Sequence, residues 1–384
     1  MEPTSRRGFL TAASAAAAGS LSGCIGGFTS AGVEGETDGR NDESQASTTE
    51  GRTERGIPLA GSQLPVEYDF AELRDEVRDG GPPKDGIPSI DEPSFWDADE
   101  ADAELDDRDV VFGLVRNDEV RAYPQTILAQ HEIVNDVVGG EAVSVTYCPL
   151  TGTAMGFRRG ETEFGVSGDL VNNNLIMYDR ETDSRWPQVL GTAISGEFEG
   201  DSLQEFRLIW TRWAAWREVH PDTEVLSTDT GHARNYDDDP YGSYVPERSG
   251  YYSRDSTLFP PLGDDDTFPN KRVVVGTRDT DGDGRIAFEK EALREEGLLS
   301  GSAGGTTHLA VHDPDLDTSY VYQNPNEETF RYEAGDGNAD DGAQAVAEDG
   351  TSHDLADLPL DRAYAFDAMW FAWSGFYPST EVVQ

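Results

Sequence analysis

Two stretches of this chain, residues 109–226 and 272–384, resemble each other in sequence. Matching segments follow in the same order in both: Val110-Val111-Phe112-Gly113 with Val273-Val274-Val275-Gly276, Gly139-Gly140 with Gly304-Gly305, Tyr147-Cys148-Pro149 with His312-Asp313-Pro314, and Trp213-Ala214-Ala215-Trp216 with Trp370-Phe371-Ala372-Trp373. The same order over such a length indicates internal duplication. We therefore expect two pseudo-symmetric repeat units that pack together, with residues 227–271 as the segment that connects them.

Each unit carries the pattern of a β-rich α+β fold. Alternating apolar residues predict strands around a turn, then a short helix, then further strands. An aromatic helix closes each unit, at residues 210–219 in the first. A spacing of three residues is that of an apolar helix face, which favours core positions over a ligand cage for the tryptophans Trp213, Trp216, Trp370 and Trp373.

The N-terminal residues predict export and lipid anchoring. Residues 1–23 carry Arg6-Arg7 before a short apolar run and then Leu21-Ser22-Gly23-Cys24, the pattern of a twin-arginine lipoprotein signal. The apolar run is too short to span a membrane. We expect Cys24 to be lipidated at the outer face of the cell membrane, residues 24–61 to form a disordered tether, and residues 62–108 to form a Pro/Gly-rich lead-in.

The charge of the chain indicates the solvent in which it folds. With 29 basic and 75 acidic residues, the formal net charge is −46. Molar salt shortens the Debye length to about 3 Å, so a high-salt solvent would screen this self-repulsion. We interpret the excess as halophilic adaptation because the acidic residues are spread along the chain. Nucleic acid is excluded as a partner because no segment supplies the clustered basic residues that phosphates require.

Cys148 is the first candidate for a functional site. It is one of two cysteines, and lipidation of Cys24 leaves it without a disulfide partner. The matching residue in the second unit is Asp313, so a thiol and a carboxylate could line a shared pocket or bind a metal. The alternative is that Cys148 packs as a small buried hydrophobe.

Lys84 is a second candidate, because 26 of the 29 basic residues are arginines. A retained lysine beside Asp85 suggests that a compact ammonium charge is needed, although a structural salt bridge is an equally good interpretation. The remaining candidates belong to polar or aromatic loops that either line a pocket or satisfy buried backbone groups. They are Asn174, Asp179, Arg180, Trp186 and Tyr241.

One segment imitates a calcium-binding loop. Asp279, Asp281 and Asp283 stand at alternate positions before a glycine. However, Lys290 stands where the loop needs a bidentate glutamate, and the preceding residues predict a strand. The matching place in the first unit is a plain hairpin turn, which favours a turn over a calcium site here. The sequence assigns no cofactor.

Several motifs resemble domain-of-unknown-function family 3179. They are Gly81-Pro82-Pro83-Lys84-Asp85-Gly86-Ile87-Pro88, Val134-Asn135-Asp136, Thr146-Tyr147-Cys148-Pro149-Leu150, Val166-Ser167-Gly168, Asn174-Leu175-Ile176-Met177-Tyr178-Asp179-Arg180 and Asp239-Pro240-Tyr241. The resemblance covers nearly everything after Tyr68 and implies an extracytoplasmic, often lipid-anchored protein without an established activity. Many relatives have a second cysteine three residues after the first, where this chain has Thr151. A dithiol or two-thiolate role is therefore not carried over.

Two functions of different classes remain open at this point. The first is an anchored module that binds a small-molecule ligand in a pocket between the units. The alternative is a metal- or thiol-dependent redox protein centred on Cys148. A purely structural envelope protein is a third interpretation, and the sequence leaves open whether the protein is an enzyme.

Overall fold

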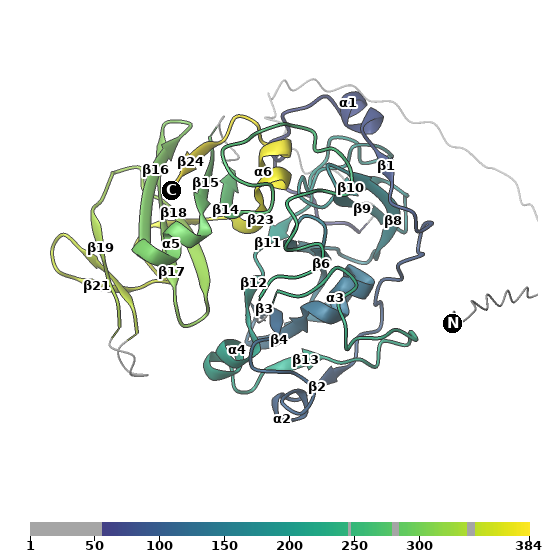
Figure 1. Ribbon diagram of the computed structural model, residues 1–384, viewed down its shortest axis with the longest axis horizontal. Coiled ribbons are helices and arrows are strands. Elements are labelled where there is room, and N and C mark those ends of the chain that lie inside the picture. The colour runs from purple at the N-terminus through teal and green to yellow at the C-terminus, as the bar shows by residue number, and fades with distance from the viewer. Residues whose placement is uncertain (1–55, 245–246, 279–283, 336–341) are drawn as a thin grey trace, which may run out of the picture. The chain divides into compact units, whose positions relative to one another are not determined.

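The structure is a computed structural model that describes residues 56–244, 247–278, 284–335 and 342–384. These residues form a mixed α+β fold that is rich in strands, and its helices are short (Figure 1). The coarse prediction of a β-rich α+β fold is therefore confirmed. No helix in this part of the chain has the length and apolar character needed to cross a membrane.

Three sheets are built from residues that precede the connecting segment. Their strand orders are β11-β7-β6-β5, β12-β3-β4-β13-β2 and β1-β8-β9-β10. The strands are β1 (Arg78–Asp79), β2 (Phe95–Trp96), β3 (Val110–Arg116), β4 (Glu119–Pro124), β5 (Ile133–Val138), β6 (Glu141–Cys148), β7 (Thr153–Arg158), β8 (Phe164–Val171), β9 (Asn174–Asp179), β10 (Arg185–Pro187), β11 (Glu205–Phe206), β12 (Ile209–Arg212) and β13 (Glu224–Leu226). The helices are α1 (Phe70–Asp75), α2 (Ala98–Ala101), α3 (Gln125–His131) and α4 (Trp213–Val219).

Three further sheets follow the connecting segment. Their strand orders are β23-β14-β15-β24, β16-β17-β18-β22 and β19-β20-β21. The strands are β14 (Val273–Arg278), β15 (Arg285–Glu289), β16 (Leu298–Ala303), β17 (Thr306–Asp313), β18 (Thr318–Gln323), β19 (Phe330–Glu333), β20 (Gln344–Ala347), β21 (Ser352–Asp354), β22 (Asp361–Ala363), β23 (Ala365–Met369) and β24 (Glu381–Val383). The helices are α5 (Lys290–Glu296) and α6 (Trp370–Phe376).

The sheets on the two sides of the connecting segment use the same connections. In the sheet orders β12-β3-β4-β13 and β23-β14-β15-β24, the first three strands pair antiparallel. The last strand pairs parallel with its neighbour in both, β13 with β4 and β24 with β15. One helix follows β4 or β15, and another follows β12 or β23.

The tryptophans of α4 and α6 are buried core residues, as their spacing predicts. The Trp216 ring packs on the backbone of Gly113, where a Cβ atom would lie 2.1 Å from the ring. Trp373 packs in the same way on Gly276, with a corresponding distance of 2.2 Å. Only glycine allows so close an approach between strand and indole.

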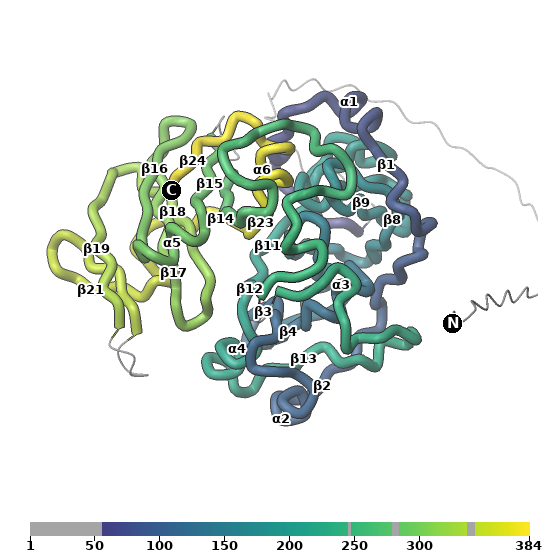
Figure 2. The backbone as a smooth tube through the Cα atoms, in the orientation of Figure 1, coloured from purple at the N-terminus to yellow at the C-terminus, as the bar shows by residue number. Residues whose placement is uncertain are grey.

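One large core cluster contains apolar residues from both sides of the connecting segment, among them Met155, Trp186 and Trp373. The connecting segment itself has neither helix nor strand in its described residues. Figure 2 shows it as a loop, in green, that passes α3 and then approaches α6. The loop therefore brings its own side chains to the region between the two sets of sheets.

Candidate functional site

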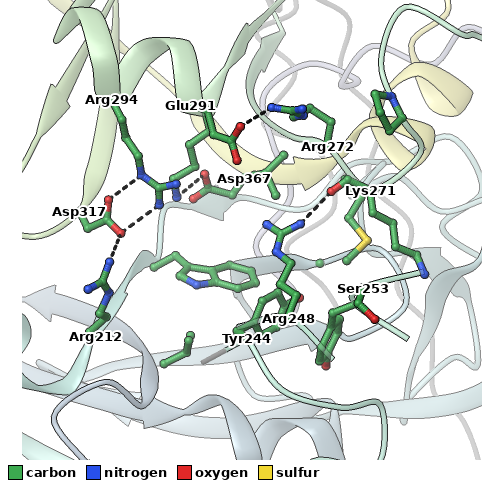
Figure 3. A pocket seen from close by; sticks show the side chains of 18 of the residues that line it. Arg212, Tyr244, Arg248, Ser253, Lys271, Arg272, Glu291, Arg294, Asp317 and Asp367 are labelled. Atoms are coloured by element: carbon green, nitrogen blue, oxygen red, sulfur yellow. Dashed lines mark hydrogen bonds and ion pairs between the residues drawn. The ribbon is translucent and has the colours of Figure 1, made fainter. Parts of the chain in front are cut away.

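A cavity of about 750 Å³ is lined by strands β12 and β14, helix α5 and the connecting segment (Figure 3). Its lining includes four acidic residues, Asp255, Glu291, Asp317 and Asp367. Against these stand eight basic residues: Arg108, Arg212, Arg248, Arg254, Lys271, Arg272, Lys290 and Arg294. In a chain with 29 basic and 75 acidic residues, this local excess of cations is opposite in sign to the rest of the protein.

On one side of the cavity, Asp317 bridges two arginines from different parts of the chain (Figure 3). Arg294 on α5 donates to both of its carboxylate oxygens, at 2.8 and 2.9 Å, and Arg212 at the end of β12 lies 3.3 Å from one of them. Burial would raise the pKa of Asp317, but the cations Arg294 and Lys290 outweigh it and lower the pKa. Asp317 therefore stays ionised and fixes both guanidinium groups.

The N-terminal end of α5 contributes a second ion-paired region. Lys290 lies 2.9 Å from the Asp367 carboxylate of β23, and both side chains are almost fully buried. Arg272 pairs with Glu289 at 3.0 Å and also with Glu291. These pairs hold helix α5 against the start of β14.

Four cations of the cavity make no ion pair with any carboxylate in the described residues: Arg108, Arg248, Arg254 and Lys271. The arginines are exposed, whereas Lys271 is only 5% exposed. Arg248 donates to the Lys271 carbonyl oxygen at 3.0 Å, and its guanidinium lies 5.8 Å from the centre of the Tyr244 ring. The three arginines retain charge and donors for a ligand, whereas the Lys271 amino group already donates to two backbone carbonyl oxygens.

Aromatic residues form the apolar part of the lining. Tyr244 and Tyr252 stack with ring centres 4.0 Å apart, and Trp210 meets Tyr244 edge to face. The Tyr252 hydroxyl donates to the Asp239 carboxylate at 2.7 Å, and Gln125 of α3 donates to the same oxygen at 2.6 Å. The buried hydrogen bonds fix these rings, which gives the cavity a rigid wall.

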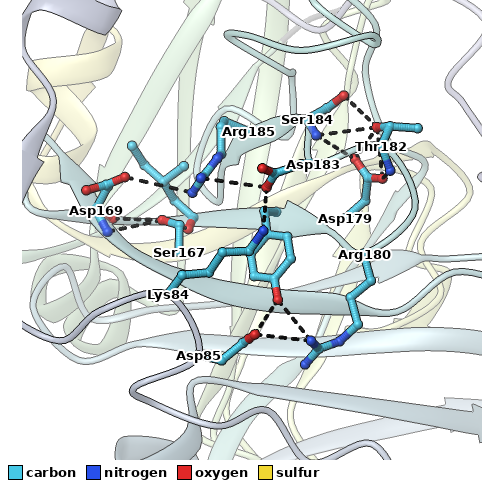
Figure 4. A network of polar contacts seen from close by, with 12 residues as sticks. Lys84, Asp85, Ser167, Asp169, Asp179, Arg180, Thr182, Asp183, Ser184 and Arg185 are labelled. Atoms are coloured by element: carbon cyan, nitrogen blue, oxygen red, sulfur yellow. Dashed lines mark hydrogen bonds and ion pairs between the residues drawn. The ribbon is translucent and has the colours of Figure 1, made fainter. Parts of the chain in front are cut away.

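None of the predicted pocket residues lines this cavity. Lys84, Asp85 and Arg180 instead surround the Tyr178 ring on β9 (Figure 4). The Lys84 ammonium lies 3.8 Å from the ring centre and 2.8 Å from Asp183. The Tyr178 hydroxyl donates to Asp85 at 2.6 Å and accepts from Arg180 at 2.9 Å. This network ties the Pro/Gly-rich lead-in to the β8–β9 hairpin.

Asp179 organises the neighbouring turn. Its carboxylate accepts from the backbone and hydroxyl groups of Thr182 and from the Ser184 amide (Figure 4). It also accepts from the Trp186 indole at 3.1 Å. The donors come from the turn itself and from β10. Asp179 and Trp186 therefore lie together, but their contacts are internal.

Cys148 is enclosed, with 1% of its surface exposed. Its sulfur accepts from the Leu175 amide at 3.4 Å and lies 3.6 Å from the Asn173 carbonyl oxygen. Burial, followed by the charge of Glu132, raises the pKa of the thiol to about 11. The thiol is therefore protonated and protected, which are the properties of a structural cysteine.

Asn174 also makes internal contacts. Its amide nitrogen donates to Gln188 at 3.0 Å and to the Thr151 hydroxyl at 3.1 Å, and its amide oxygen accepts from the Val189 amide. The sequence leaves two uses open for this polar loop, lining a pocket or satisfying buried polar groups. These contacts satisfy buried backbone and side-chain groups.

The other predicted residues are scattered. Tyr241 packs against Tyr251 in the connecting segment. Asp313 lies at the end of β17, where its carboxylate accepts from the amides of Asp315 and Leu316 and its pKa is raised by burial. Cys24 and the calcium candidates Asp279, Asp281 and Asp283 lie outside the described residues. Within the described residues, no group of three or more His, Cys, Asp and Glu side chains is arranged to hold a metal ion.

Glu132 carries no obvious sequence motif, yet its surroundings are unusual. It follows α3 with a φ of 61°, is only 6% exposed, and its carboxyl group has no hydrogen-bond or ion-pair partner among the described residues. Gly297, with a φ of 75°, occupies the same place after α5. The backbone carbonyl oxygen of Glu132 accepts a hydrogen bond from a backbone amide of β6, and that of Gly297 accepts one from a backbone amide of β17, each at 2.8 Å. A comparison of the residues after the two predicted helices, Glu132 in one stretch and Gly297 in the other, is the sequence signal that could have found it.

We expect Glu132→Gln to raise the free energy of unfolding by about 3–4 kcal/mol more at pH 8 than at pH 5. Burial raises the Glu132 pKa to about 8 in the folded protein. Between the unfolded pKa and pH 8, only the unfolded chain releases this proton, so wild-type stability falls as pH rises. The neighbouring Cys148 and Tyr241 also have raised pKa values and stay protonated in this range.

Urea unfolding at pH 5 and pH 8 measures this difference. The control is Glu296→Gln, an exposed residue near the end of α5. Equal effects of Glu132→Gln at the two pH values would show that Glu132 is ionised in the folded protein at pH 5.

Comparison with known proteins gives one family match. A model of the family described as "Protein of unknown function (DUF3179)" matches residues 84–380. Neither the curated proteins nor the solved structures gave a match. The match begins at Lys84 and includes β3 through α6, so it covers the residues on both sides of the cavity. Because it spans well over half of the chain, this protein belongs to the DUF3179 family.

Proposed function

We propose that this protein is a lipid-anchored extracytoplasmic module that binds a small anion in the cationic cavity and is adapted to high salt. The observation that carries the proposal is the reversal of charge at the cavity, where eight basic residues face four acidic ones in a chain of net charge −46. Export, lipidation at Cys24 and the membrane as a partner rest on the N-terminal sequence pattern.

The chemistry of the cavity suits an anion in concentrated salt. At molar salt, long-range attraction is screened within a few ångströms, so an anion must be held by short hydrogen bonds. Guanidinium groups offer paired donors that match carboxylate and phosphate oxygens. Arg108, Arg248 and Arg254 have no carboxylate partner within the described residues and carry this geometry.

We also propose that residues 109–226 and 272–384 are two copies of one ancestral unit. Their matching sequence order, the shared strand orders and the two Trp-on-Gly contacts support this interpretation. The cavity takes Arg212 from the first stretch and Arg294 from the second, and ligand binding would thus depend on both. The buried, protonated state of Cys148 weighs against the thiol-centred alternative.

Arg254→Gln should weaken binding of inorganic phosphate or oxalate about five- to tenfold, a loss of about 1 kcal/mol. The side chain is exposed and has no described ion pair, so its removal takes a ligand donor without damaging the fold. Isothermal titration calorimetry in molar KCl measures the affinity.

The matched control is Arg331→Gln, an exposed arginine on β19 outside the cavity, which should leave the affinity within about twofold. The proposal is contradicted if the wild-type protein binds neither anion with a Kd below about 10 mM, or if the two variants lose affinity equally.

A further inference from the structure

Lysine is rare in this chain and concentrated at the cavity. There are three lysines, Lys84, Lys271 and Lys290, and the last two both line the cavity. Lys290 is explained by its buried ion pair with Asp367. Lys271 has no ion pair with a carboxylate in the described residues, so charge pairing does not explain why it is not an arginine. An amine differs from a guanidinium in that it can lose its proton and form a bond to carbon.

Backbone groups hold the Lys271 amino group in place. Its nitrogen donates to the carbonyl oxygens of Tyr251 and, at 2.9 Å, of Ser256. An ammonium group and a neutral amine can both donate these two hydrogen bonds. In the neutral form, the two N–H groups suffice for the two acceptors, and the lone pair is left for a carbonyl carbon.

Burial of Lys271 favours partial deprotonation at mildly alkaline pH. Burial lowers its pKa to about 8, and the charge of Arg254 acts in the same direction, whereas Asp255 raises it. The Tyr251 ring, 3.1 Å from the nitrogen, favours the ammonium form. Arg248 adds a further cation, bound to the Lys271 carbonyl oxygen. A substantial fraction of neutral amine is thus present at mildly alkaline pH.

We infer that Lys271 forms an imine with an aldehyde or oxo acid whose phosphate or carboxylate group is held by the arginines of the cavity. This inference rests on the proposed anion-binding function and adds the substrate class, an anionic carbonyl compound. The amine lone pair attacks the carbonyl carbon, and proton transfer gives a carbinolamine. Water then leaves as the C=N bond forms. The step involves no oxidation or reduction, and water reverses it.

Pyridoxal 5′-phosphate, an aldehyde that carries a phosphate, is a suitable probe. The full chain in molar KCl is incubated with it and then treated with sodium borohydride, which reduces the imine to a stable amine. Peptide mapping should place the adduct on Lys271, with labelling at least about tenfold faster than at the exposed Lys84. The labelling rate should rise with pH to a midpoint near 8, and pyridoxal without the phosphate should react more slowly.

Lys271→Arg keeps the positive charge and removes the amine, so it should lose the adduct. Lys84→Arg is the control and should be labelled at Lys271 like wild type. If wild type binds phosphate but Lys271 is labelled no faster than Lys84, the inference is wrong and the anion site stands. If wild type binds no phosphate, the proposed function fails as well.

Discussion

Arg278→Met should lower the free energy of unfolding by about 3–5 kcal/mol, because it leaves a buried carboxylate without its partner. Arg278 on β14 is 1% exposed at its side chain and lies 2.5 Å from the Glu205 carboxylate of β11. It also donates to the Val189 carbonyl oxygen at 2.6 Å and to the Tyr377 hydroxyl. One guanidinium thus joins the sheet of β14 to the residues before the connecting segment.

The loss should be larger at pH 8 than at pH 5. Burial raises the pKa of Glu205 to about 7, with Arg278 acting against it. Without Arg278, the folded protein must keep Glu205 protonated, and this becomes more costly as pH rises above the unfolded pKa.

Urea unfolding in molar KCl measures these effects. The matched control is Arg331→Met on exposed β19, with an expected change within about 0.5 kcal/mol. The double variant Arg278→Met/Glu205→Leu should recover part of the stability because it removes both buried charges. A loss below about 1 kcal/mol for Arg278→Met would show that the pair does not hold these elements together.

Transfer from about 3 M to about 0.1 M KCl should unfold most of the protein, a loss of several kcal/mol. The Debye length grows from a few ångströms to about 10 Å, so carboxylates that were screened begin to repel one another. The formal net charge is −46. The repulsion is stronger in the compact state than in the unfolded chain, because the carboxylates lie closer together in the compact state.

Circular dichroism during stepwise dilution of KCl follows the transition. A parallel series in which sucrose replaces the removed salt separates screening from solute exclusion, because sucrose favours burial but screens no charge. Unfolding should persist in sucrose. An unchanged free energy of unfolding at 0.1 M KCl would contradict the halophilic interpretation.

The β-rich fold and the core tryptophans follow from the sequence because both depend on local periodicity. The hairpin patterns of β3–β4 and β14–β15, and the spacing of Trp213 and Trp216, involve residues close together in the chain. Such patterns arise when one face of a strand or helix is buried, and the sheets and helices of this structure bury those faces.

The cavity is harder to predict because its residues come from distant parts of the chain. Arg108, Arg212, Lys271 and Arg294 share no motif, and only the packing of β12, β14 and α5 brings them together. One signal was available: the rarity of lysine, which drew attention to Lys84, applies equally to Lys271 and Lys290. Lys84 itself lies in a network that ties loops together.

The predicted pocket residues are polar groups that make internal contacts. Asn174 and Asp179 look like ligand-binding side chains in the sequence, yet their hydrogen bonds satisfy a turn and a hairpin. Sequence alone cannot distinguish these uses, because an Asn or Asp in a loop offers the same groups to a ligand and to the backbone.

The central claim is that the cationic cavity binds an anion, and a crystal structure with tungstate tests it most directly. Tungstate is a tetrahedral dianion whose metal gives strong anomalous scattering, so its position can be found without assumptions about the ligand. The account predicts an anomalous peak inside the cavity, within hydrogen-bonding distance of Arg248 or Arg254. Peaks only on the outer surface, or no peak in crystals grown from molar salt, would contradict it.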